Sequence, residues 1–135
     1  MAYKITGKNI KDDIVEKVEE ISGQNVFECY QCGNCSAGCP VVDYMDIAPH
    51  QIMRLAQLGA TEEILNCETI WICSACLQCS TRCPKGIDVA KVMEAFRTIN
   101  LRKRLAPLNP DEIAEKDLKE LPPIALVGAF RKMTG

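Results

Sequence analysis

Two copies of one cysteine pattern constrain this chain more than any other feature of its sequence. Residues 29–40 read Cys-Tyr-Gln-Cys-Gly-Asn-Cys-Ser-Ala-Gly-Cys-Pro, and residues 73–84 read Cys-Ser-Ala-Cys-Leu-Gln-Cys-Ser-Thr-Arg-Cys-Pro. Both follow C-x₂-C-x₂-C-x₃-C-P, and every cysteine and the proline recur after 44 positions. This spacing is typical of loops that bind iron–sulfur clusters through cysteine thiolates.

The spacing also predicts how the cysteines are shared between clusters. Three cysteines at intervals of three residues form a tight loop around one corner of a cubane, whereas a fourth cysteine followed by proline leaves that loop extended. In two-cluster ferredoxins the fourth cysteine binds the other cluster. We therefore expect two 4Fe–4S clusters. The predicted ligand sets are Cys29, Cys32, Cys35 and Cys83 for the first cluster, and Cys73, Cys76, Cys79 and Cys39 for the second.

Other uses of cysteine explain the pattern less well. A tetrahedral zinc site needs two C-x₂-C pairs and would leave the third cysteine of each motif unused. Disulfides are disfavoured because nine cysteines is an odd number and cysteines three apart on a tight loop rarely reach bridging geometry. The ninth, Cys67, fits no ligand pattern. It is expected to be a small buried hydrophobic side chain, with a redox-sensing thiol as the alternative.

Composition restricts the class of protein further. The chain has 135 residues, of which 47% are hydrophobic with the nine cysteines included, and a formal net charge of −2. A chain of this size buries only a thin apolar core, and its charge excludes a strongly basic nucleic-acid-binding surface. No secretory signal is evident at the N-terminus, and the longest apolar run, Ile124–Phe130, is too short to cross a bilayer. We expect a cytoplasmic protein that binds neither nucleic acid nor membrane.

The segments around the cysteine motifs carry helical patterns. Asn9 can cap a helix with Ile10, Ile14, Val18 and Ile21 on one face, ending near Gly23. Asp46 and Pro49 predict the start of a helix that ends near Gly59, and Thr61 opens a short one. Asp88 can cap a helix with Val89, Val92, Phe96 and Ile99 at helical spacing. Because no segment alternates with a period of two, the predicted fold is all-α.

The last third of the chain has a different character. Asn109, Pro110 and Glu112 resemble a helix start, Pro122-Pro123 would end that helix, and the apolar run Ile124–Phe130 follows. The two cluster motifs are complete without it. We therefore expect an α-helical domain over residues 1–104 with both clusters between its helices, and a helical tail over residues 105–135 that docks on another subunit. Packing of the tail on the domain's own core is the alternative.

Single residues near the motifs invite narrower interpretations. The only histidine, His50, is predicted to be a surface or capping residue, and Trp71 to shield a cluster. Arg82 and Lys85 flank Cys83 and can offset cluster charge, or can simply be solvated. No glycine-rich nucleotide fingerprint is present, and all eight motif cysteines are used by the clusters, so no catalytic residue is expected.

The paired motifs on a helical frame resemble the α-helical ferredoxin family. Within it, residues 29–40 and 46–54, the stretch Ile70-Trp-Ile-Cys73 and the ending Leu121–Thr134 are similar to the family of the C subunit of soluble heterodisulfide reductase. The cysteine motifs specify the superfamily, and the C-terminal ending points to this subunit. Relatives with a 2Fe–2S domain, with Cys-Cys-Gly domains or with membrane-spanning helices are disfavoured, because those features do not occur here.

This resemblance implies a function. In the family, the C subunit carries electrons from the flavin-containing, electron-bifurcating A subunit to the B subunit, which reduces the coenzyme M–coenzyme B disulfide in methanogens. The expected partners are the A and B subunits of heterodisulfide reductase, with a hydrogenase or formate dehydrogenase attached through the A subunit. The chain would then be the iron–sulfur subunit of an oxidoreductase, without catalysis of its own. A free-standing dicluster ferredoxin or an iron–sulfur redox sensor is the alternative.

Overall fold

The computed structural model describes residues 12–103 and 108–134. These residues form helices and turns and contain no strand, which confirms the predicted all-α class. Three short 3₁₀ turns, at Val26–Glu28, Val42–Tyr44 and Pro110–Glu112, lie between the helices. The helices are α1 (Asp13–Ser22), α2 (Asn34–Ala37), α3 (Pro49–Leu58), α4 (Thr61–Leu65), α5 (Thr69–Ile72), α6 (Gln78–Arg82), α7 (Val89–Arg102), α8 (Glu115–Glu120) and α9 (Pro123–Met133).

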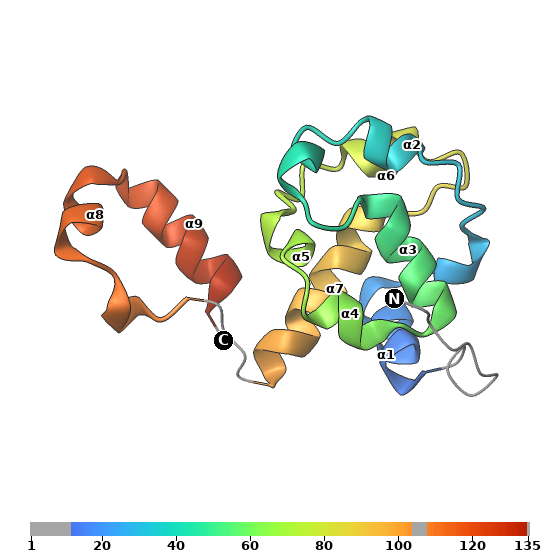
Figure 1. The fold of residues 1–135 in the computed structure, drawn as a ribbon, viewed down its shortest axis with the longest axis horizontal. Coiled ribbons are helices and arrows are strands. Elements are labelled where there is room, and N and C mark those ends of the chain that lie inside the picture. Colours follow the sequence, from blue (N-terminus) through green and yellow to red (C-terminus); the bar gives the residue numbers. More distant parts are fainter. Residues whose placement is uncertain (1–11, 104–107, 135) are drawn as a thin grey trace. The chain divides into compact units, whose positions relative to one another are not determined.

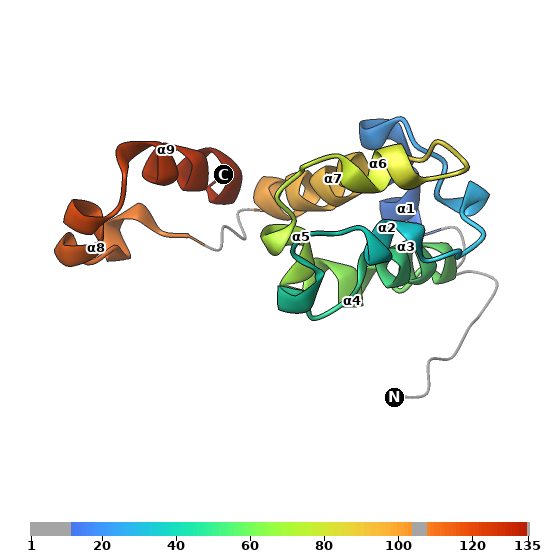
Figure 2. The ribbon, with the colours of Figure 1, turned by 90° about the horizontal axis from the view of Figure 1, so that it is seen from above.

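The chain divides into two compact units, Met1–Arg97 and Thr98–Gly135. Both cysteine motifs lie in the first unit, where Figure 1 shows α2 and α6 along one edge and α1 and α4 along the opposite edge. The turned view in Figure 2 shows α6 and α7 on one side of this unit and α3 and α4 on the other. The predicted domain boundary after residue 104 falls outside the described residues and stays a prediction.

Helix α1 begins and ends through local interactions. Asp12 is its cap and accepts a hydrogen bond from the Ile14 N–H (3.4 Å), and Gly23 ends it at φ 66°. The predicted cap, Asn9, lies outside the described residues. The apolar stripe is displaced by one position from the prediction: Val15 and Val18 are buried, whereas Ile21 is 38% exposed. Ser22 takes the buried position because its hydroxyl donates to the Val18 carbonyl (2.6 Å).

Helix α3 begins with Pro49, as predicted, but Asp46 does not cap it. The Gln51 carboxamide accepts the Ala48 N–H (2.9 Å) at the start of α3. The Asp46 carboxylate instead accepts the N–H groups of Glu68 and Thr69, both at 2.9 Å, and so caps α5. The sequence-based assignment of Asp46 to α3 is therefore wrong, since a side chain two residues before the cap position here turns toward a segment that is distant in sequence.

Helix α7 is the longest helix of the described chain and follows the sequence prediction closely. Asp88 accepts the Lys91 N–H (3.2 Å) in its first turn. The four predicted apolar positions, Val89, Val92, Phe96 and Ile99, are all buried. The core of the larger unit lies between α7 and the helices α1, α3, α4 and α5, and its largest apolar side chains are Phe96, Ile52, Met53, Ile64, Ile70 and Met93.

The C-terminal unit carries two further helices. The predicted start at Asn109 gives only the single turn Pro110–Glu112, because the backbone is extended at Ala114 (ψ 139°) before α8. Two ion pairs at i,i+4 spacing, Lys119–Glu115 and Lys116–Glu120, support α8. Helix α9 begins at Pro123 and contains the apolar run.

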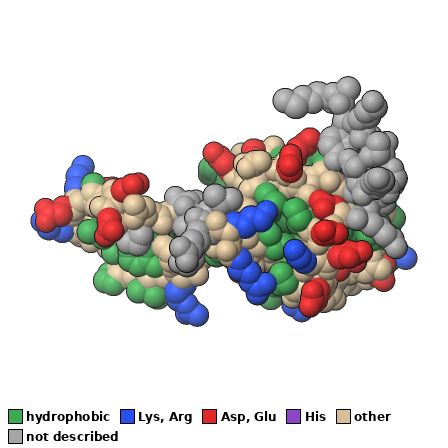
Figure 3. Space-filling view, turned by 90° about the horizontal axis from the view of Figure 1, so that it is seen from below, with side chains coloured by type: hydrophobic (Ala, Val, Ile, Leu, Met, Phe, Trp, Pro, Cys, Tyr) green, Lys and Arg blue, Asp and Glu red, His purple; other side chains and the backbone are tan. Residues whose placement is uncertain are grey.

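The surface of the larger unit carries charges of both signs. Figure 3 shows acidic and basic side chains on one face of it, with hydrophobic side chains between them. Within the described parts of the chain, no helix is both long enough and apolar enough to span a membrane.

Candidate iron–sulfur centre

The two cysteine loops have the same backbone conformation at equivalent positions. Gln31 and Gly33, on either side of Cys32, have φ angles of 64° and 80°. Ala75 and Leu77, on either side of Cys76, have φ angles of 52° and 63°. Left-handed residues alternating with ordinary ones direct successive N–H groups into a concavity that favours anions, a feature found at many iron–sulfur sites. Three of these four residues are not glycine, and such strain is characteristic of functional loops.

The short helices that follow the two loops pack against each other. Gly33 and Leu77 precede α2 and α6, and these two helices are in direct contact. Cys35 lies on α2 and Cys79 on α6, while the fourth cysteine of each motif follows directly after its helix. The contact between the helices therefore brings the end of each motif beside the other motif.

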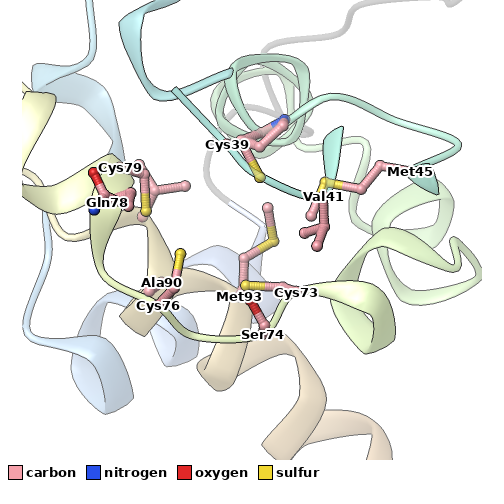
Figure 4. Close-up of a pocket in the computed structure, with 12 residues that line it drawn as sticks. Cys39, Val41, Met45, Cys73, Ser74, Cys76, Gln78, Cys79, Ala90 and Met93 are labelled. Atoms are coloured by element: carbon pink, nitrogen blue, oxygen red, sulfur yellow. The ribbon is translucent and has the colours of Figure 1, made fainter. Parts of the chain in front are cut away.

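One cavity collects cysteines from both motifs. Cys39 of the first motif lines it together with Cys73, Cys76 and Cys79 of the second. Figure 4 shows these four side chains around one space, with Met93 of α7 between them. Thiols that are 34 or more positions apart in sequence are thus neighbours, as the spacing of the motifs predicts.

The rest of this cavity is apolar. Its further lining includes Val41, Met45, Pro49, Val89 and Ala90. Burial raises the pKa of the Cys79 thiol to about 11, although hydrogen bonds from the Ala90 and Ser80 N–H groups act in the opposite direction. A thiolate in such surroundings needs nearby positive charge, and ligated iron is the charge that a cysteine-lined site is suited to take.

The cysteines of the other predicted set also lie close together. Desolvation, followed by the thiols of Cys32, Cys83 and Cys29, raises the pKa of the Tyr30 hydroxyl. Burial raises the pKa of Cys35, and the thiol of Cys29 contributes to that rise. Cys83 of the second motif is therefore near Cys29 and Cys32 of the first. The Gln31 carboxamide donates a hydrogen bond to Cys29 Sγ (3.4 Å).

The donor set fits cubane clusters. All eight motif positions supply thiols, the ligands that iron–sulfur clusters use. Within the described residues, no three His, Cys, Asp or Glu side chains converge closely enough to hold one metal ion. Four thiols that bind four different irons of a cubane need not converge in that way. The chemistry and placement of these residues therefore suit a cluster in each position.

Two interactions that the sequence did not reveal position Cys73. Arg97 is 1% exposed, and its Nη1 donates to the carbonyls of Ile70 (2.8 Å) and Cys73 (3.0 Å). Thr69 is fully buried, and its hydroxyl donates to Asp46 Oδ1 (2.6 Å). Burial of Asp46 opposes ionisation, but hydrogen bonds from Thr69, Glu68 and Ile47 outweigh it and lower the pKa of this carboxyl. Helix α5 and the cysteine after it are thereby fixed at both ends.

The remaining sequence-predicted residues have separate environments. Cys67 is 4% exposed with its pKa raised by burial, which confirms the expectation of a small buried side chain. His50 is half-buried and is not a cap: its Nδ1 forms a hydrogen bond of 2.7 Å with Ser36 Oγ, and its N–H donates to the same oxygen (2.9 Å). Trp71 is half-buried on α5, and Arg82 and Lys85 are exposed.

Comparison with known families agrees with this geometry. Residues 28–88 match the family described as 4Fe-4S dicluster domain. This segment contains both cysteine motifs and the helices α2 to α6. A 4Fe–4S dicluster domain is an electron-transfer domain, so the matched part of the chain carries that function.

Curated proteins similar to the chain share one designation. The iron-sulfur C subunit of CoB–CoM heterodisulfide reductase from Methanopyrus kandleri is 35% identical over 92 residues, which are 67% of this chain and 48% of that protein. The C subunit of the H₂:CoB-CoM heterodisulfide,ferredoxin reductase of Methanothermobacter marburgensis is 33% identical over 89 residues, 66% of this chain and 48% of that protein. The C subunit of the ferredoxin:CoB-CoM heterodisulfide reductase of Methanosarcina mazei is 30% identical over 87 residues, 64% of this chain and 53% of that protein.

The chain spans about half the length of the curated relatives it matches. Their shared designation is that of an iron–sulfur subunit of an oxidoreductase, heterodisulfide reductase. The segment that they share with this chain is of the same size as the one on which the cysteine loops and their supporting helices lie. The chain is a homologue of the C subunit of heterodisulfide reductase, and its residues 28–88 form a 4Fe–4S dicluster domain.

Proposed function

We propose that the chain is the electron-transfer subunit of a heterodisulfide reductase complex, with two 4Fe–4S clusters as its redox groups. The observation that carries this proposal is the cavity in which Cys39 meets Cys73, Cys76 and Cys79, because it supports the exchange of fourth ligands expected for two neighbouring cubanes. Each such cluster accepts and releases one electron at a time. The other proposed ligand set is Cys29, Cys32, Cys35 and Cys83.

The chain's own residues bind and shield these clusters and do no bond chemistry. A catalyst of disulfide reduction needs an open iron site, a reactive thiol or a flavin. The proposed ligand sets use all eight motif thiols, and Cys67 is buried with a raised pKa, so its thiolate form is disfavoured. We therefore propose that reduction of the disulfide takes place on a partner, the B subunit of the complex, and that electrons arrive from the flavin-containing A subunit.

The C-terminal segment is proposed to dock on a partner subunit. Helix α9 has no buried residue, and Ile124 and Val127 are 78% and 50% exposed. Leu118 and Leu121, on and directly after α8, are 41% and 46% exposed. Exposed apolar side chains at helical spacing are typical of a helix that binds in a groove of another protein. We assign residues 105–135 this role, beside a cluster domain over residues 1–104.

The first test is chemical analysis of the anaerobically purified chain. Two cubanes require about eight irons and about eight acid-labile sulfides per chain. A content of about one zinc without labile sulfide would contradict the cluster assignment.

The second test is a relay assay with the cluster-loaded chain. A low-potential donor should bleach both clusters, and the coenzyme M–coenzyme B disulfide should then yield no multiple-turnover thiol release. Addition of the B subunit should start turnover. Sustained turnover by the chain alone would contradict the relay, and a lack of stable association with the A and B subunits would favour a free-standing ferredoxin.

A further inference from the structure

The two cysteine loops share a backbone but differ in one side chain beside the first cysteine. Gln31 and Ala75 are equivalent residues of the two motifs, and both are left-handed, with φ angles of 64° and 52°. The Gln31 Nε2 donates a hydrogen bond to Cys29 Sγ (3.4 Å). Ala75 ends in a methyl group and has no hydrogen to donate to its own loop. A side-chain donor at this position is therefore specific to the first motif.

A donor at a ligand sulfur affects how easily a cluster is reduced. The electron added on reduction increases the negative charge on the cluster and its thiolate ligands. An N–H group directed at a ligand sulfur stabilises that charge, and hydrogen bonds to the sulfurs are among the factors that set the reduction potential. The amide of Gln31 is neutral and cannot lose its proton at ordinary pH, so this effect persists throughout the working pH range.

The surroundings of the two ligand sets act in the same direction. Gln31 also lines an open cleft of about 500 Å³, whose other residues are mostly polar or charged: Asp46, Ile47, His50, Gln51, Arg54, Leu55 and Glu63. The cavity at the second motif is instead lined by apolar side chains such as Val41, Val89 and Met93. Polar, water-accessible surroundings stabilise added negative charge better than apolar ones do.

We propose that Gln31 is a positioning residue that raises the reduction potential of the cluster at Cys29, Cys32, Cys35 and Cys83 above that of its neighbour. This inference rests on the proposed function, since it requires both clusters. The cluster of the first motif is then the one reduced first, and the cluster at Cys39, Cys73, Cys76 and Cys79 has the lower potential. The two ligand sets are thereby energetically unequal despite their matching cysteine spacing.

A pair of reciprocal variants tests the proposal. Gln31→Ala gives the first loop the residue of the second, and Ala75→Gln does the reverse. Each residue type already occurs in a left-handed conformation at the equivalent position, so both loops accommodate the exchange. The midpoint potentials of both clusters are measured by redox titration of the full-length, cluster-loaded protein, followed by electron paramagnetic resonance.

The expected results differ between the two variants. Gln31→Ala lowers the higher of the two midpoint potentials and leaves the lower one unchanged, and Ala75→Gln raises the lower one, so the gap narrows in both. Unchanged midpoints in variants with wild-type iron and sulfide content would overturn the role of Gln31. If Gln31→Ala loses iron, Ala75→Gln decides alone, and an unshifted lower midpoint overturns the proposal. Wild-type protein without about eight irons and sulfides would instead contradict the underlying cluster assignment.

Discussion

The side chain of Arg82 lies over Gly38, so close that a β-carbon at position 38 would overlap its guanidinium end. Each of the two residues directly precedes the fourth cysteine of its motif, and they are related by the same 44-position shift as the cysteines. The lack of a side chain at one position thus leaves room for the long side chain at the other. This contact joins the ends of α2 and α6, where the chain continues to Cys39 and Cys83.

The contact predicts a small and conditional effect of Gly38→Ala. Gly38 has an ordinary φ of −104°, so alanine causes no backbone strain there. The exposed Arg82 side chain can move away, and the destabilisation should stay at about 0.5–1 kcal/mol, below the usual cost of overpacking a core. Urea unfolding should show this cost in the wild-type background. In an Arg82→Ala background it should vanish, and a cost that persists there would mean that backbone, not Arg82, limits the space.

Exchange of the fourth ligands predicts crossed effects of cysteine substitution. Cys39→Ala should remove the cluster associated with Cys73, Cys76 and Cys79, although Cys39 belongs to the first motif, because it lines their cavity. Cys83→Ala should remove the cluster of the first motif. Iron content should fall to about four per chain in each case. Electron paramagnetic resonance distinguishes the remaining clusters, and loss of the cluster in the substituted motif's own loop would contradict the ligand sets. Cys67→Ala is the matched control and should retain all iron.

Arg97 is expected to support the cluster of the second motif from behind. Arg97→Met removes the donor to the carbonyls of Ile70 and Cys73 and leaves both buried without it, at a cost of about 3 kcal/mol. Displacement of Cys73 should also lower iron content, with the first cluster retained. Glu94 is the control, since its side chain is 58% exposed beside Arg97. Glu94→Gln should cost under about 1 kcal/mol and leave iron content unchanged. Equal effects of the two variants would contradict a specific role of the carbonyl contacts.

Asp46→Asn tests the cap of α5. The substitution weakens the acceptor for the N–H groups of Glu68 and Thr69 and should destabilise the protein by about 1 kcal/mol. Because the pKa of Asp46 is lowered in the folded state, its contribution is complete above its ordinary pKa and is lost as pH falls through the lowered value. The difference from wild type in unfolding free energy should therefore be constant from about pH 6 upward. A difference that changes across neutral pH would contradict this account.

Truncation after Leu105 separates the two interpretations of the C-terminal segment. If α8 and α9 dock on a partner, the shortened chain should keep its iron and its cluster spectra. It should then bind its partners at least about tenfold more weakly, which corresponds to about 1.4 kcal/mol. Size-exclusion chromatography and a binding titration measure this. Loss of the clusters or precipitation would mean instead that the segment belongs to the core of the cluster domain.

Local features of the structure were predictable from sequence. Gly23 and Gly59 end α1 and α3 in left-handed conformations, and Asp88 accepts a hydrogen bond in the first turn of α7. Such interactions connect residues a few positions apart, so their pattern is visible in the sequence alone. The meeting of Cys39 with the second motif was also predictable, because the repeated spacing specifies a known way of sharing ligands.

Features that depend on distant contacts were not predictable. Asp46 binds α5 across 22 and 23 positions, and Arg97 binds a carbonyl 27 positions away. Arginine is seldom buried, so its place in the apolar pattern of α7 gave no signal. The left-handed conformations of Gln31, Ala75 and Leu77 were equally hidden, since side chains of these types rarely adopt positive φ.

The cavity that joins Cys39 to the second motif also determines when the protein can acquire its cofactors. A ribosome completes the first cysteine loop well before it reaches Cys73, yet the thiols that line this cavity exist together only after Cys79 has been added. The proposed partner set waits four residues longer, for Cys83. A nascent chain halted between the motifs therefore presents the cysteines of the first motif alone, joined at most by Cys67, and neither ligand set is complete. Delivery of iron and sulfide must follow synthesis of both halves, and the machinery that inserts them meets a nearly finished domain.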